Sequence, residues 1–148
     1  PIANEIVHNF EQFLDDRDIW DLVRFIKEGQ IDTYDYLFKD FHPTTNESIY
    51  SPRGNASNGK TLYESTLDAD PTGGNCFKCH GIKGDTINFG QTNESIVYIG
   101  DLARENIWEF IHKARFGQPG TDMPGTINTG LNTSQVMDIV AHAITLNQ

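Results

Sequence analysis

Apolar residues recur at helical spacing near the N-terminus. Four of them follow the i, i+3, i+4, i+7 rule for one face of a helix: Ile19, Leu22, Val23 and Ile26. Gly29 follows as a stop signal, and a run of aspartates precedes this face, where the dipole of a helix favours acidic side chains. The pattern predicts one long or two shorter amphipathic helices within residues 1–30.

A second apolar group is mainly aromatic and lies between residues 31 and 41. Its members are Tyr34, Tyr36, Leu37, Phe38 and Phe41. We expect a short helix or turn that packs onto a core and ends at His42, because Pro43 biases the preceding residue away from helix. Residues 44–58 are rich in Asn, Ser, Thr, Pro and Gly, which is typical of a surface connection.

The rest of the chain alternates helical patterns with glycine-rich loops. Three helices with an apolar stripe are predicted, over residues 58–68, 101–116 and 132–146. Ser57 or Asn58 caps the first helix and Asp101 the second, and Asn132 with Gln135 has the pattern of a capping box for the last. The loop over residues 81–100 is long for a compact domain, so we expect it to cover something.

Charge is distributed unevenly along the 148 residues, and the formal net charge is -10. Such an acidic chain would be repelled by nucleic acid. Residues 1–50 carry eleven acidic and four basic side chains, which suits a basic protein partner. We therefore expect an acidic helical extension over residues 1–50 and a second domain over residues 51–148. No window approaches the roughly 20 apolar residues of a membrane-spanning helix, so no transmembrane segment is expected.

The chain has two cysteines, Cys76 and Cys79, and both stand in a Cys-x-x-Cys-His run that ends at His80. Two thiols on one helical turn face the same way, so each can bond to a vinyl group of one porphyrin, and the histidine supplies an axial ligand to the iron. A redox-active cysteine pair would instead follow a strand, and a zinc site would need a second pair of ligands. The flanking helices and the glycine-rich turn favour covalent haem attachment.

The second axial position has six candidates: Met123, Met137, His8, His42, His112 and His142. Met137 lies in a predicted helix, where methionine is typical of core packing. His112 and His142 also lie in predicted helices, where a lone histidine is more often half-exposed or hydrogen-bonded than a ligand. Met123 stands in a loop stiffened by Pro119 and Pro124, from which a thioether can reach the iron at little ordering cost. We therefore favour Met123, which leaves no open coordination position.

Residues from about Asn58 to Leu146 resemble a class I cytochrome c. The resemblance is carried by three stretches: Gly59-Lys60-x-Leu62-Tyr63, Cys76-Phe77-Lys78-Cys79-His80-Gly81 and Gln118-Pro119-Gly120-Thr121-Asp122-Met123-Pro124. It implies an all-α class I cytochrome c fold, in which the N- and C-terminal helices cross near Gly59 and one covalent haem c is held by Cys76, Cys79, His80 and Met123. The chain departs from the pattern at His142, where many members carry an aromatic residue.

The stretch from Leu14 to Ile26 resembles the C-terminal helix of another cytochrome c domain, although no Cys-x-x-Cys-His run precedes it. Two interpretations of residues 1–50 stay open. They are the remnant of a degenerate or truncated haem domain, or they are a helical extension that packs on the haem domain.

The expected function is electron transfer through one haem c, without catalysis of its own. The chain would act as a soluble carrier or as the electron-transfer subunit of a redox enzyme, with redox proteins as partners. The alternatives are a haem enzyme or gas-sensing domain with an open or displaceable distal site, and a docking subunit held by the acidic extension. Because haem is ordinarily joined to this motif on the outer side of the energy-transducing membrane, we expect a bacterial periplasmic location. The first five residues lack the features of a signal peptide, so we expect its prior removal, or a piece of a longer chain.

Overall fold

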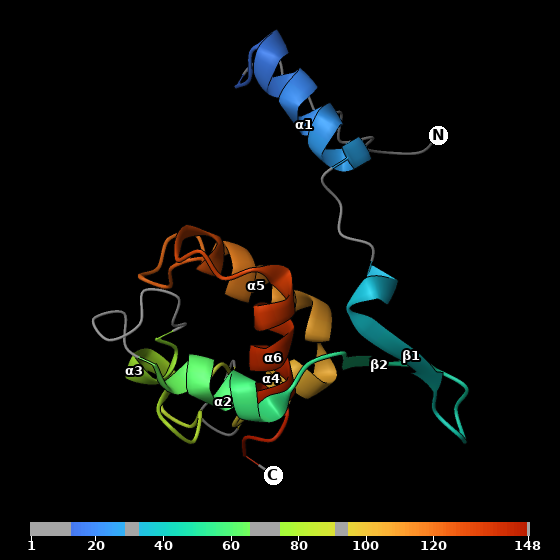
Figure 1. Ribbon diagram of the computed structural model, residues 1–148, viewed down its shortest axis with the longest axis vertical. Coiled ribbons are helices and arrows are strands. Elements are labelled where there is room, and N and C mark those ends of the chain that lie inside the picture. Colours follow the sequence, from blue (N-terminus) through green and yellow to red (C-terminus); the bar gives the residue numbers. More distant parts are fainter. Residues whose placement is uncertain (1–12, 29–32, 66–74, 91–94, 148) are drawn as a thin grey trace. The chain divides into compact units, whose positions relative to one another are not determined.

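The computed structural model describes residues 13–28, 33–65, 75–90 and 95–147 (Figure 1). The chain divides into two compact units, Pro1–Asp32 and Thr33–Gln148. This division falls before the boundary expected after residue 50, and residues 33–50 belong to the second unit.

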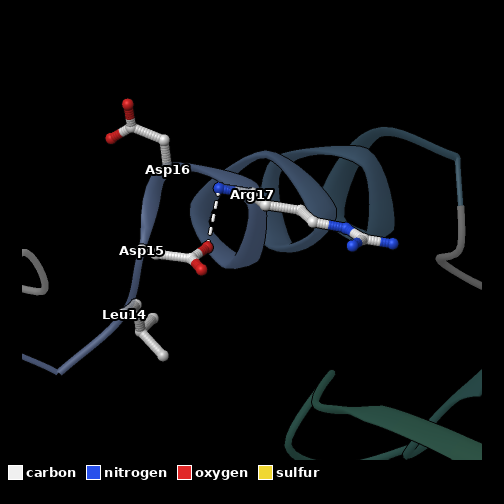
Figure 2. A pocket seen from close by; sticks show the side chains of 4 residues that line it. All are labelled: Leu14, Asp15, Asp16 and Arg17. Carbon is white, nitrogen blue, oxygen red and sulfur yellow. Dashed lines mark hydrogen bonds between the residues drawn. The ribbon is translucent and has the colours of Figure 1, made fainter.

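The described part of the first unit is dominated by one helix, α1 (Asp16–Glu28), as the apolar periodicity predicts. Asp15 caps it, since its Oδ1 accepts hydrogen bonds of 2.9 Å from the backbone N–H groups of Arg17 and Asp18. Asp18 Oδ2 in turn accepts from the N–H of Asp15 at 3.1 Å, which completes a capping box. Figure 2 shows an open pocket beside this cap, lined by Leu14, Asp15, Asp16 and Arg17.

The second unit opens with a short 3-10 turn (Thr33–Asp35) and a β-hairpin, so the expectation of an all-α fold is wrong for this segment. Strand β1 (Leu37–Phe41) pairs antiparallel with β2 (Ser48–Pro52). Alternate residues of a strand share a face, and Leu37 on one such face is 2% exposed. The ring centroid of Tyr50, on the same face, lies 5.1 Å from that of Trp108. These two side chains anchor the hairpin on the helices.

The described residues after the hairpin form five helices: α2 (Ala56–Glu64), α3 (Phe77–His80), α4 (Ile99–Glu105), α5 (Ile107–Phe116) and α6 (Thr133–Ala143). The cap of α2 is Asn55, before either expected residue. The helix predicted over residues 101–116 is two helices, because Asn106 has φ -139° and ψ 68° and its side chain accepts a 3.2 Å hydrogen bond from the N–H of Glu109. The capping box of Asn132 and Gln135 at the start of α6 is confirmed. A short 3-10 turn (Thr126–Asn128) precedes α6.

The core of the second unit lies where α6 crosses α2 (Figure 1). A Cβ on Gly59 would collide with the backbone carbonyl of Asp138 and would lie 3.0 Å from Cβ of His142. The expected crossing at Gly59 is therefore present. Val140 and Met137 of α6 are fully buried, so the expectation that Met137 is a core residue is confirmed.

The segment just after α6 is held by Arg104 of α4. Its guanidinium donates hydrogen bonds of 2.7 Å and 2.8 Å to the backbone carbonyls of Ile144 and Leu146. The same side chain pairs with Asp101 at 2.5 Å. Asp101 lies within α4 and its carboxylate accepts from the N–H of Tyr98 at 2.8 Å, so the cap of this helix is Tyr98 and the expectation that Asp101 is the cap is wrong. Arg104 thereby joins α4 to the residues that follow α6.

None of the helices in the described ranges combines the length and the apolar character that crossing a membrane requires.

Candidate haem-binding site

The Cys-x-x-Cys-His run forms a single helical turn. His80 donates its backbone N–H to the carbonyl of Cys76 at 2.9 Å, and Cys79 donates to the same carbonyl at 3.3 Å. Cys76 is half-buried and Cys79 exposed, and both thiols are free. Burial raises the pKa of the Cys76 thiol to about 12, so this thiol is protonated at neutral pH. The turn thus presents two free thiols and one imidazole within five residues.

Two residues in the left-handed region bracket this turn. Asn75 has φ 52° and Gly81 has φ 78°. Asparagine is one of the few residues besides glycine that adopts such angles readily. At position 81 a glycine is needed for a second reason, because a Cβ there would collide with Oγ1 of Thr86. The N–H of Gly81 donates to the carbonyl of Phe77 at 2.8 Å and ends α3. The turn is therefore defined by its own local sequence.

Helix α2 is tied to the turn by a hydrogen bond that the sequence did not reveal. The hydroxyl of Tyr63, whose side chain is completely buried, donates to the carbonyl of Gly81 at 2.8 Å. Burial raises the pKa of this phenol well above its ordinary value, so it remains a donor. The tyrosine itself was the only sign of this bond in the sequence, since a buried tyrosine hydroxyl requires a hydrogen-bond partner. Tyr63 thus fixes the residue that follows His80.

His80 is a buried imidazole, with 8% of its surface exposed. Its Nδ1 is buried and has no hydrogen-bond partner among the residues that the structure describes. Burial lowers the pKa of His80, which favours the neutral ring that a metal ion requires. The ring centroid of Phe89 lies 5.9 Å from that of His80, so the long loop does return to the motif.

Met123 is half-buried and lies in a tight loop after α5. Gly117, with φ 79°, bridges to Pro124 across the base of this loop. The backbone N–H of Met123 donates to Oγ1 of Thr121 at 3.2 Å, and a Cβ on Gly117 would lie 2.5 Å from the carbonyl oxygen of Met123. The loop therefore has a defined path, held by backbone contacts at both ends.

The other candidates for the second axial position lie elsewhere. His112 is exposed on α5 with its ring centroid 5.1 Å from that of Phe116, and His142 is buried at the crossing of α2 and α6. Nδ1 of His42 accepts hydrogen bonds from Thr44 and Thr45 in the hairpin turn, at 3.3 Å and 3.2 Å. His8 lies outside the described residues.

Apolar side chains are exposed in the two loops that follow α3 and α5. They are Ile82, Ile87, Phe89, Ile96 and Ile127. Figure 1 shows that α3 and the loop after α5 both lie on the left side of α6. Exposed apolar surface of this kind is typical of a site that an apolar group or a partner covers, and a porphyrin is such a group. Together with the two free thiols and the buried imidazole of the turn, these apolar residues are the kinds of side chain that hold a c-type haem.

The chain matches no protein-family model, no curated protein and no solved structure at a significant level. The likeness to class I cytochromes c consequently rests on the motifs of the sequence and stays a prediction. Among the side chains that the structure describes, no three His, Cys, Asp or Glu residues are grouped so as to hold a metal ion.

Proposed function

We propose that this chain binds one haem c covalently and transfers electrons, either as a carrier or as the electron-transfer subunit of a redox complex. The observation that carries the proposal is the Cys-x-x-Cys-His run on one helical turn, with a buried His80 at its end. Cys76 and Cys79 would hold the porphyrin through thioether bonds, and His80 would occupy one axial position of the iron. When bound, the haem supplies an iron that gains and loses a single electron.

The protein contributes position and exclusion of water. Tyr63 holds Gly81 at 2.8 Å and so restricts the turn that carries His80, while the burial of the imidazole keeps it neutral. The exposed apolar side chains of the two loops would close over the faces of the macrocycle. A buried haem with restricted ligands changes little on reduction, which suits rapid electron exchange.

In this proposal Met123 would supply the second protein ligand to the iron. Its loop is closed by the bridge between Gly117 and Pro124, so the thioether is offered from a backbone of defined path. A neutral sulfur ligand raises the reduction potential relative to a second imidazole. With both His80 and Met123 bound to it, the iron would have no free site for oxygen or peroxide, which would distinguish a carrier from a haem enzyme or gas sensor.

The proposal also implies a fold family, a cellular location and a class of partner. The second unit would have the class I cytochrome c fold, with α2 and α6 as its crossing terminal helices and the β-hairpin as an addition. Haem attachment would take place in the periplasm, and redox proteins would be the partners. The acidic segment before residue 50 would favour a partner with a basic surface, and the resulting association would weaken with salt.

Covalent attachment is tested by producing the full chain together with a cytochrome c maturation system and then extracting it with acidified acetone. The proposal predicts that the haem stays with the polypeptide, and that the intact mass rises by one haem. In the double variant Cys76→Ser/Cys79→Ser the haem is extracted or absent. A wild-type chain that carries no haem, or that releases it on extraction, would refute the proposal.

A further inference from the structure

His142 occupies the crossing of α2 and α6, where the resemblance leads one to expect an aromatic side chain. It is 7% exposed. Its Cβ would lie 3.0 Å from a Cβ on Gly59, and its ring meets that of Tyr63 edge-on, with centroids 5.3 Å apart and planes at 70°. A titratable ring thus fills a position that packing alone would give to an apolar one.

In the part of the chain that the structure describes, the imidazole of His142 has no acceptor for a second proton. Its Nε2 is buried and without a hydrogen-bond partner among the described residues. A neutral ring can keep its proton on Nδ1 and leave Nε2 as a bare acceptor. Protonation would place an N–H group and a positive charge at a buried atom with nothing to receive them, which is costly.

The charged groups around α6 do not remove this cost. On α2, Glu64 raises and Lys60 lowers the pKa of His142, and these two side chains lie 3.9 Å apart, so their effects oppose each other. Burial is the largest cause and lowers the pKa.

On the neighbouring elements, Arg104 pairs with Asp101 on α4 and Lys113 with Glu109 on α5, and β2 contributes Tyr50 against Trp108. On α6 itself, Asp138 accepts from the N–H of Asn55 at 2.6 Å.

We propose that His142 makes the crossing of α2 and α6 sensitive to acid, and that Tyr63 transmits the loosening to the turn that carries the Cys-x-x-Cys-His motif. The ring of Tyr63 rests against His142, and its hydroxyl holds Gly81. A protonated His142 disfavours the closed crossing, and the hydrogen bond to Gly81 weakens with it. This device depends on the fold of the second unit and not on the proposed electron transfer.

The direction of the pH dependence follows from the lowered pKa. The unfolded chain takes up a proton at about the ordinary histidine pKa of 6.5, whereas the folded chain resists it. The stabilisation by neutral His142 is therefore complete above pH 6.5 and is lost as the pH falls from there through the folded pKa. For each pKa unit that separates the folded from the unfolded chain, full protonation lowers the folding equilibrium constant about tenfold.

The test compares urea unfolding of the full purified chain with that of His142→Phe at about pH 7.5 and about pH 5, on either side of an ordinary histidine pKa. We expect the ratio of wild-type to variant folding constants to fall on acidification, because only the wild-type chain carries the buried imidazole that resists protonation. His112→Phe, at an exposed histidine of α5, is the matched control and should keep the wild-type dependence. An unchanged ratio for His142→Phe overturns the proposal.

Two measurements on the wild-type protein keep the test decisive if the variant does not fold. The NMR titration of the His142 ring should have its midpoint below 6.5, and a midpoint at or above that value refutes the proposal. Hydrogen exchange should show lower protection factors at acidic pH for the N–H groups of Gly59 and Gly81, which donate within α2 and α3. Lower protection at Gly59 with unchanged protection at Gly81 would refute the transmission through Tyr63.

Discussion

Tyr63 and Gly81 are 18 residues apart in the chain, and the hydroxyl of Tyr63 donates a 2.8 Å hydrogen bond to the backbone carbonyl of Gly81. This bond joins α2, one member of the central crossing, to the residue that follows His80. The position of the candidate ligand thus depends on the packing of the core as well as on its own helical turn.

The first prediction concerns this bond. Tyr63→Phe keeps the ring against His142 and leaves the Gly81 carbonyl without its donor, which should cost about 1 kcal/mol of unfolding free energy. The absorption spectrum and the reduction potential of the proposed haem should shift as well, because the turn with His80 gains freedom. Tyr50→Phe, which retains the ring contact with Trp108, is the control and should leave the potential unchanged. Equal potentials in wild type and Tyr63→Phe would show that the bond does not position His80.

The second prediction concerns the crossing. Gly59→Ala introduces a Cβ into the space of the Asp138 carbonyl, so α2 and α6 must separate. We expect a loss of about 3 kcal/mol in the free energy of unfolding, the upper part of the usual range for overpacking. Ser57→Ala, at an exposed position of the same helix, should change stability little. A Gly59→Ala protein as stable as Ser57→Ala would contradict the close approach of the two helices.

The third prediction compares the two methionines. Met123→Ala should abolish the weak far-red iron–methionine band of the oxidised protein and allow carbon monoxide to bind the reduced protein rapidly. Met137→Ala should leave the spectrum intact but should lower the unfolding free energy by about 3 kcal/mol, because it leaves a cavity in the core. Fast stoichiometric carbon monoxide binding by the wild-type protein would favour the haem enzyme or gas sensor instead.

The fourth prediction concerns the end of α6. Arg104→Ala removes hydrogen bonds to the carbonyls of Ile144 and Leu146, and we expect it to cost about 2 kcal/mol. Arg104→Lys should recover only part of this stability, since an ammonium group lacks the fork that reaches several oxygens. Thermal unfolding of the two variants checks the order. A lysine variant no more stable than the alanine variant would show that a positive charge at this position contributes nothing without the geometry of the guanidinium group.

The elements that the sequence predicted well are those with local signals. The capping box of Asn132 and Gln135 and the apolar spacing of α1 need no information from distant residues. The hairpin was missed because a short apolar run is compatible with helix or strand, and its pairing with Ser48–Pro52 is a contact across a loop. The break at Asn106 was readable, since asparagine is a preferred cap, but the apolar stripe continues across it.

The candidate site likewise has one part that the local sequence predicts and one part that depends on contacts between distant residues. The turn of Cys76, Cys79 and His80 follows from five consecutive residues, and the structure has it as one turn of helix. The partnership of His80 with Met123 depends on how two loops meet across the second unit, which spacing along the chain does not encode. It stays a prediction that rests on the chemistry of the two side chains.

The most direct test of the proposed function is a redox titration of the purified full chain followed by its absorption spectrum. The proposal predicts a single reversible one-electron transition, with the far-red iron–methionine band present in the oxidised form and lost on reduction. A chain without a covalently bound haem, or one whose haem shows no reversible transition and binds carbon monoxide at once when reduced, would contradict it.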